Sequence, residues 1–108
     1  MQEIKVASVM HALADPTRRR IYERVVKAGE TTVAELARTS AVSQPAISQH
    51  MKSLREAGLV GQRHSGRNTH YRANPRGLEP LVHWIGIYGV FWSGRFAKLK
   101  ELLKEIDP

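Results

Sequence analysis

The spacing of apolar and polar residues between positions 32 and 60 predicts two short helices joined by a tight turn. Thr32 and Glu35 have capping-box spacing, so a helix is expected from about 33 to 38 or 39. After a turn at 40–42, Ser43 or Gln44 is expected to cap a second helix, which stops at Gly58. Its buried face is predicted from three apolar residues at i, i+4 and i+7: Ile47, Met51 and Leu54.

Similar patterns divide the rest of the chain. A helix is expected over about 3–14, and Asp15-Pro16, an N-cap followed by proline, begins another that stops near Gly29. Two short strands, about 60–63 and 69–73, flank the turn at 65–68 and predict a small hairpin. A long final helix is expected over 80–106. The predicted fold is mainly α with a small β-hairpin, about five helices in one domain over 1–108.

The final helix carries most of the large apolar residues of the chain. Its most apolar run, 81–92, is too short to span a bilayer and favours a buried or interfacial helix. Gly86, Gly89 and Gly94 each disfavour helix, which predicts close packing or a local irregularity there. We expect no membrane segment and no signal peptide, and a cytoplasmic location.

The net charge of +7 is concentrated in the middle of the chain. Residues 31–76 contain seven Lys/Arg against two acids, a net +5, while 1–30 carry +2 and 77–108 carry none. A basic segment of this kind suits a polyanionic partner. A solvated basic face that only aids solubility remains the alternative.

The sequence lacks the residues, or the groupings of residues, that several classes of chemistry require. The absence of cysteine excludes disulfides, thiolate metal sites and cysteine nucleophiles. The carboxylates are scattered, and no phosphate-cradling glycine loop or nucleophile–base pair is evident, so an enzyme is not expected. The five histidines show no i, i+3 or i, i+4 pairing, and neither a metal nor another cofactor is expected.

The second helix of the 32–60 segment and the hairpin together suit duplex DNA. A helix fits the major groove, where Gln, Ser and Lys can read base edges, while hairpin cations reach phosphates or the minor groove. Arg67 is the candidate for minor-groove or backbone contact, next to Gly66 at the turn. The full set of predicted DNA-binding residues is Gln44, Ser48, Gln49, Lys52, Arg63, His64, Arg67, Asn68 and Arg72. Free backbone N–H groups at the helix N-terminus were also expected to favour phosphate.

Three motifs then resemble one family. The stretches 13–21 (LADPTRRRI), 42–50 (VSQPAISQH) and 54–60 (LREAGLV) are similar, in the same order, to winged helix-turn-helix regulators of the ArsR type. The resemblance spans nearly the whole chain and implies a homodimer formed by the first and last helices (1–14 and 80–106), with 31–73 as helix-turn-helix and wing. It also implies repression from an inverted-repeat operator. The predicted dimer-interface residues are Val6, Met10, Trp84, Tyr88, Phe91, Leu99, Leu102 and Leu103.

The chain departs from the metal-sensing members of that family. Where they carry Cys-x-Cys after Glu-Leu, it has Ala37-Arg38-Thr39, and Leu81 replaces the Asp of an Asp-x-His pair ending here at His83. The resemblance is therefore to a cysteine-free branch that does not sense metals. The aromatic residues of 83–92 could line a pocket for an unknown small-molecule effector, although dimer packing explains them more simply.

The sequence thus predicts a sequence-specific DNA-binding regulator that acts as a homodimeric repressor, with duplex DNA and a second copy as partners. The main alternative is a winged helix used for protein–protein contacts, without specific DNA recognition. It would not require Gln44, Ser48, Gln49 and Arg67 to act together.

Overall fold

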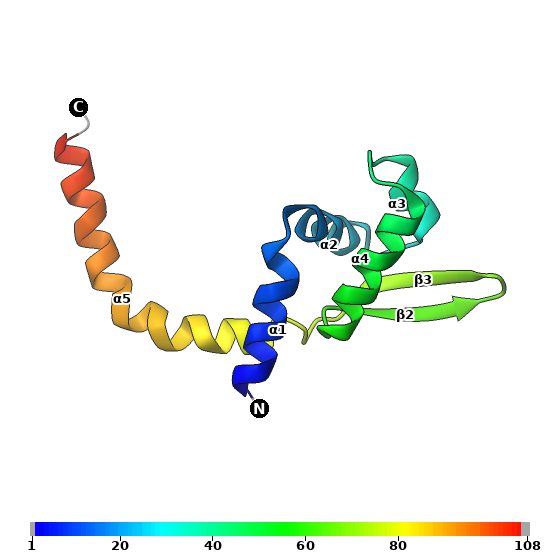
Figure 1. Cartoon of the computed structure of the whole chain (residues 1–108). Helices are drawn as coiled ribbons and strands as arrows, with labels where there is room; N and C mark the ends of the chain where they lie inside the picture. Colours follow the sequence, from blue (N-terminus) through cyan, green and yellow to red (C-terminus); the bar gives the residue numbers. More distant parts are fainter. Residues whose placement is uncertain (1, 107–108) are drawn as a thin grey trace.

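The computed structural model describes residues 2–106 (Figure 1). Helices α1 (Gln2–Ala14) and α2 (Pro16–Ala28) lead into the short strand β1 (Glu30–Thr31). Helices α3 (Val33–Arg38) and α4 (Gln44–Glu56) follow, then the hairpin strands β2 (Val60–Ser65) and β3 (Asn68–Ala73) and the long helix α5 (Glu79–Ile106). The five helices and the hairpin predicted from sequence are confirmed, and both hairpin strands are longer than predicted.

The predicted helix caps explain where the helices begin. Asp15 accepts the N–H of Arg18 at 2.8 Å, and Pro16 follows it as the first residue of α2. Ser43 caps α4 by accepting the N–H of Ala46 at 3.3 Å. The capping box at Thr32 is only half formed: Thr32 accepts the N–H of Glu35, whose carboxylate instead accepts the hydroxyl of Thr31. Each cap satisfies a backbone donor that the first helical turn leaves without a partner.

The sheet contains one strand more than the predicted hairpin. Its order is β1-β3-β2, and both pairings are antiparallel. In the hairpin, Val60 lies opposite Ala73 and Ser65 opposite Asn68, while Glu30 of β1 lies opposite Arg72. A strand of two residues is too short to show an alternating pattern in the sequence. Strand β1 forms because it pairs with β3, a segment distant in the chain. The hairpin is therefore attached to the body by β1.

One apolar core lies where α1, α2, α3 and α4 meet the start of β2. The predicted buried face of α4 is confirmed, with Ile47, Met51 and Leu54 fully buried. Val42, in the turn before α4, is partly buried and packs against this core. The core residues are Val9, Ala12, Ile21, Val25, Leu36, Ile47, Met51, Leu54, Leu59 and Val60. Burial of this set fixes α4 with its polar face outward.

Backbone contacts join the end of α4 to the start of α5. Asn74 donates its side-chain N–H to the carbonyl of Gly58 at 2.9 Å, and its backbone N–H to Leu59. Gly77 is buried beside them, where a Cβ would lie 2.6 Å from the carbonyl oxygen of Gly58. No side chain fits between the two segments, so we call this close approach the 58–77 junction.

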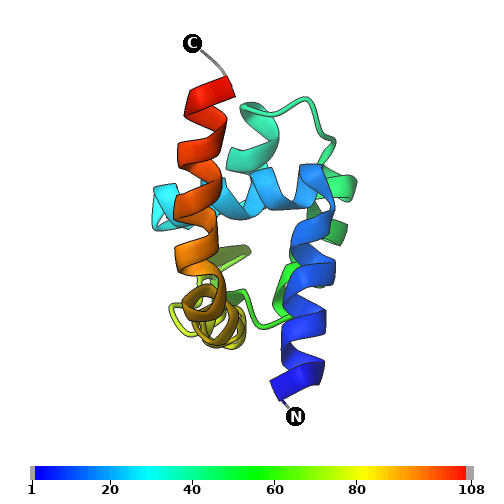
Figure 2. The same ribbon diagram turned by 90° about the vertical axis from the view of Figure 1, so that its left-hand side faces the viewer.

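Helix α5 is not buried, contrary to one of the two expectations for its apolar run. None of its residues is buried, and every described residue from Phe91 onward is exposed. Figure 1 shows a sharp bend between the yellow and orange parts of the helix, and Figure 2 shows the two parts running in different directions. No side chain packs against Gly86 or Gly94, so the expected irregularity is found rather than close packing within the chain. Ser93, which donates its hydroxyl to the Val90 carbonyl, adds to the bend.

The projection of α5 away from the body gives the chain an extended shape (Figure 1). Its radius of gyration is 17.7 Å, against about 13 Å for a compact domain of this length. Within residues 2–106, no helix combines the length and apolarity needed to cross a bilayer. Neither burial within the described chain nor a membrane span therefore explains the apolar residues of α5.

Candidate nucleic-acid interface

The outer face of α4 consists of polar side chains. Gln44, Ser48, Gln49 and Lys52 are all exposed and lie away from the buried Ile47, Met51 and Leu54. Packing of the apolar face fixes the helix, so these four side chains have a defined direction. They can supply paired amide contacts, a hydroxyl and a cation to a nucleic acid.

The N-terminus of α4 offers fewer free N–H groups than expected. Pro45 has none, the N–H of Ala46 is bonded to the Ser43 side chain, and that of Ile47 to the Ser43 carbonyl. In the described part of the chain this leaves the amide of Gln44 for an anion. The expected phosphate site at this terminus is therefore reduced to one donor, because the cap and the proline occupy the others.

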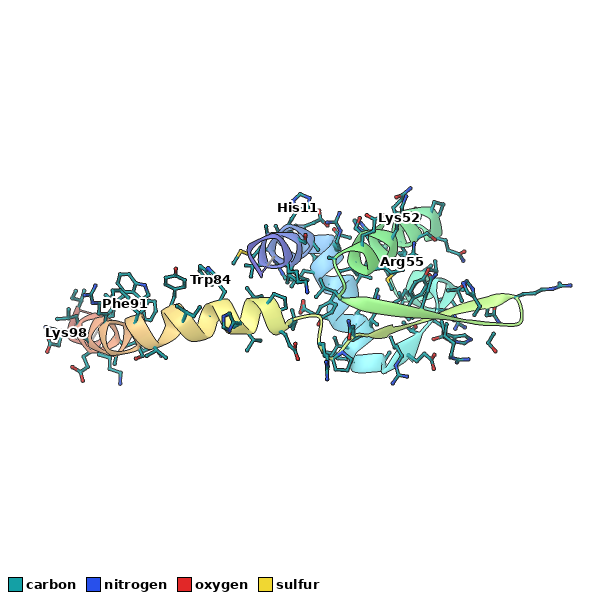
Figure 3. All side chains as sticks on the ribbon, turned by 90° about the horizontal axis from the view of Figure 1, so that it is seen from below. His11, Lys52, Arg55, Trp84, Phe91 and Lys98 are labelled. Atoms are coloured by element: carbon teal, nitrogen blue, oxygen red, sulfur yellow. The ribbon has the colours of Figure 1, made fainter. Side chains whose placement is uncertain are left out.

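Arg55 extends the outer face and was missed from the sequence. It lies three residues after Lys52 and seven after Ser48, and it is exposed. Figure 3 shows Lys52 and Arg55 together on α4, at the opposite end of the molecule from Lys98. The i, i+7 spacing with Ser48 was the signal that could have found it. Glu56 is the exposed acid that ends this face.

The hairpin projects from the body beside α4 (Figure 1), and we call it the wing. Gly66 has a φ of +62° at its turn, a conformation that favours glycine. Arg67 and Asn68 follow at the tip and are exposed. No acid of the described residues forms an ion pair with Arg67, so its charge is available to a phosphate.

The base of the wing differs electrostatically from its tip. The Arg63 Nε donates to Glu30 Oε1 at 3.0 Å, forming an exposed salt bridge between β2 and β1. This hydrogen bond is the main reason why the pKa of Glu30 lies below its ordinary value, and the charges of His70 and Arg72 act in the same direction. The positive charge of Arg63 is therefore largely compensated within the protein.

The other predicted wing residues are brought to the same hairpin. His64 Nδ1 and the Thr69 hydroxyl are 3.0 Å apart and share a hydrogen bond across the strands. Arg72 is exposed on β3, opposite Glu30. The predicted site thus divides into an exposed polar face on α4, an uncompensated cation at the wing tip and a partly neutralised wing base.

The predicted dimer residues fall into two groups. Val6 and Met10 of α1 and Trp84 and Tyr88 of α5 line an open apolar groove of about 420 Å³, and the ring centroids of Trp84 and Tyr88 lie 4.9 Å apart with the rings tilted by 44°. The other group, Phe91, Leu99, Leu102 and Leu103, lies exposed at and beyond the bend, away from α1. In Figure 3, Trp84 and Phe91 project from the same side of α5, Trp84 nearer to α1 and Phe91 further along the helix.

No three His, Asp or Glu side chains of residues 2–106 converge in a way that could hold a metal ion. His11, His64 and His83 are on separate elements. The site described so far therefore consists of polar and cationic groups directed outward.

Comparison with known proteins assigns the family. The family model of the helix-turn-helix domain matches residues 13–63. The chain is 43% identical to the arsenical resistance operon repressor of Escherichia coli over 95 residues, 87% of this chain and 78% of the relative. The chain belongs to the ArsR family. It is a DNA-binding transcriptional regulator with a winged helix-turn-helix fold.

Solved ArsR-family structures support the same assignment. An ArsR-like transcriptional regulator from Rhodococcus sp. RHA1 superposes with a TM-score of 0.74 at 31% identity, covering 93% of both chains. A homodimeric winged helix-turn-helix DNA-binding domain from Mycobacterium bovis superposes with a TM-score of 0.64 at 26% identity, covering 79% of this chain and 78% of that one. An HTH-type transcriptional regulator of Mycobacterium tuberculosis is 50% identical over 70 residues, 65% of this chain; the match spans 64% of that relative.

Proposed function

We propose that this ArsR-family regulator is a homodimeric repressor that binds an inverted-repeat operator through α4 and the wing. The observation that carries the proposal is the exposed polar face of α4 beside an uncompensated Arg67. In a symmetric dimer the two α4 helices enter successive major grooves, about 34–36 Å apart. Repression is supported by the similarity to the arsenical resistance operon repressor of E. coli.

Within this site each residue type has a separate role. Gln44, Ser48 and Gln49 are proposed to read base edges, with Lys52 reaching guanine or phosphate. Arg67 and Asn68 contact the backbone or minor groove, and Arg63, His64 and Arg72 contribute to phosphate binding at the wing base. Because it binds cellular DNA, the protein is expected to act in the cytoplasm.

The direct test is selection of bound sites from a randomised duplex library at moderate salt. Recovery of a two-fold-symmetric site with half-sites one helical turn apart supports the proposal. The double variant Gln49→Ala/Arg67→Ala should lose affinity for the selected site while keeping its fold by circular dichroism. Lys98→Ala, a loss of positive charge far from the wing, is the matched control and should bind like the wild type.

The runner-up is a winged helix that serves protein–protein contacts. An unchanged DNA affinity in the Gln49→Ala/Arg67→Ala variant would favour it, since a protein-binding module has no need of these two side chains at DNA. Enrichment of no site from the library would point the same way, or to a missing small-molecule effector.

Self-association is proposed to use the groove between α1 and α5 and the exposed residues beyond the bend. The support is the homodimeric M. bovis neighbour and the exposure of Leu99, Leu102 and Leu103. Leu99→Asp should convert dimer to monomer in sedimentation velocity, because it buries a charge in an apolar contact. Lys98→Asp places the same charge one residue earlier and should remain dimeric. A dimeric Leu99→Asp variant would move the interface elsewhere.

A further inference from the structure

A small polar cleft lies where the end of α1 and the start of α2 meet α4. We call residues 8–18, which form one side of it, the α1–α2 corner. The cleft has a volume of about 270 Å³, and all three helices contribute to its lining. Pockets for whole small molecules usually occupy about 300–1,000 Å³, so this cleft suits a small group that belongs to a larger ligand. Its polar lining consists of Ser8, His11, Arg18, Ser53 and Glu56.

Arg18 brings hydrogen-bond donors to this cleft that the protein leaves largely unused. Its Nη1 donates to the Ala12 carbonyl at a long 3.4 Å, and its Nε is buried without a partner among the described residues. Asp15 accepts the backbone N–H of Arg18, but no acid of residues 2–106 forms an ion pair with the guanidinium. A guanidinium carries five N–H donors in a planar fork that matches phosphate. An oxyanion in the cleft would therefore supply acceptors that the protein does not.

The surface around the cleft is positively charged. Residues 5–20 contain four Lys/Arg and one acid, a net +3. His11 is exposed on α1, and the half-buried Ser53 adds a hydroxyl from α4. Guanidinium and hydroxyl groups are common ligands of backbone phosphates in protein–DNA complexes.

The cleft lies along the edge of the outer face of α4. Ser53 directly follows Lys52 and lies one turn after Gln49, so it borders that face. In Figure 3 the His11 side chain projects from α1 on the side of the molecule on which Lys52 projects from α4. Figures 1 and 3 both show α1 on one side of α4 and the wing on the other. A duplex bound to α4 therefore has the wing on one side and the α1–α2 corner on the other.

We propose that the α1–α2 corner binds the DNA backbone beside α4, with His11, Arg18 and Ser53 as ligands of one phosphodiester in each half-site. The inference rests on the proposed operator binding and adds a contact on the side that the wing does not reach. The major groove is about 12 Å wide and has a sugar–phosphate backbone on each side. The wing reaches toward one backbone, and the corner holds the other. Because α1 is also proposed to join two copies, the corner contacts lie between the two α4 helices of a dimer and the wing contacts lie outside them.

Glu56 favours a backbone phosphate over free phosphate in this cleft. Its exposed carboxylate is part of the lining and repels anions. Inorganic phosphate carries more than one negative charge at neutral pH, whereas a phosphodiester carries one, so the repulsion of the diester is weaker. Contacts at α4 and the wing also deliver the backbone to the cleft, which makes this further contact effectively intramolecular. The duplex is therefore the occupant.

The chain has no cysteine, so a DNA-cleaving iron chelate can be attached to single introduced cysteines. Ser8→Cys places the chelate in the cleft without replacing any of the three proposed ligands. Ser65→Cys, exposed at the end of β2 in the wing, is the positive control, and Lys98→Cys, at the opposite end of the molecule, is the negative control (Figure 3). On the selected operator, the chelate at position 8 is expected to cut the backbone between the two half-sites. The chelate at position 65 should cut outside them, and the chelate at position 98 should not cut.

The salt dependence of binding tests the role of Arg18 separately. Arg18→Gln should lower the slope of log affinity against log salt by about 1.8 in a dimer, because two contacts of about 0.9 each are lost. Arg18→Lys retains the charge and should keep most of the slope. Circular dichroism of both variants checks that the fold is intact.

Other outcomes overturn the inference. Cuts from position 65 with none from position 8 would remove the corner from the interface while leaving operator binding in place. An unaltered slope in a folded Arg18→Gln variant would remove Arg18 from the phosphate ligands. Thermal stabilisation of the DNA-free protein by inorganic phosphate, together with no cuts from position 8, would mean that the cleft holds a free anion instead. Failure to select any operator would refute the proposed function itself.

Discussion

The salt bridge at the base of the wing predicts that two arginines of one hairpin contribute unequally to DNA binding. Each phosphate contact adds about 0.9 to the slope of log affinity against log salt. A dimer carries two copies of Arg67, so Arg67→Ala should reduce the slope by about 1.8. Between about 50 and 200 mM salt, the ratio of the wild-type affinity to the Arg67→Ala affinity should therefore change about tenfold. Arg63→Ala should reduce the slope by much less, because Glu30 already balances its charge.

The assay is fluorescence anisotropy of the selected duplex over a salt series, with both variants and the wild type. Glu30→Gln provides the complementary test, since it removes the counter-charge and should steepen the slope unless Arg63 is also replaced. Equal reductions for Arg63→Ala and Arg67→Ala would refute the assignment of separate roles. No change with Arg67→Ala would remove the wing tip from the interface.

Three further predictions concern stability. Ser43→Ala should lower the free energy of unfolding by about 1 kcal/mol through loss of the α4 cap, measured by urea denaturation; Ser48→Ala on the same helix should not, and an equal loss would contradict the capping role. Gly77→Ala should cost about 3 kcal/mol because its Cβ meets backbone, whereas Gly61→Ala meets nothing within 4 Å and should be neutral or stabilise by up to about 1 kcal/mol. The N–H of Arg18 lowers the pKa of Asp15 below its ordinary 3.8, so this carboxylate adds stability above that value that is lost as pH falls through the lowered pKa. In Asp15→Asn, Tm should fall less steeply as the pH is lowered. An unaltered pH profile of Tm would mean that another group causes the loss of stability in acid.

The features predicted well from the sequence are those encoded by a few neighbouring residues. Asp15-Pro16, Thr32 and Ser43 start helices because a side-chain oxygen needs only a backbone N–H three residues away. Gly58 and Gly66 have φ values of +79° and +62°, conformations in which glycine is strongly preferred, and they mark the end of α4 and the wing turn. The apolar face of α4 follows from its 3.6-residue period. Its opposite face, which carries Gln44, Ser48, Gln49 and Lys52, was therefore predicted with it.

What the sequence did not predict depends on contacts between distant segments. Strand β1 exists only by pairing with β3, and the Glu30–Arg63 salt bridge joins residues 33 positions apart. The reduced set of free N–H groups at the α4 N-terminus has a local cause instead. Pro45 has no N–H, and the Ser43 side chain accepts the N–H of Ala46. For the apolar run of α5 the sequence left two expectations open, buried or interfacial, because an apolar helix pattern does not reveal whether its cover is the same chain or another; the exposure of α5 excludes the first.

The 58–77 junction has a consequence for how such a regulator could be retuned. Backbone contacts backbone there, so no side chain separates the end of α4, the helix proposed to read bases, from the start of α5, the helix proposed to join two copies. A change in the tilt of α5 at its start is therefore expected to shift the end of α4 as well, because the two segments are in backbone contact. In the proposed dimer, substitutions along α5 can then alter the distance between the two α4 helices. The spacing of the half-sites would change with that distance, while every residue proposed to read a base stays the same.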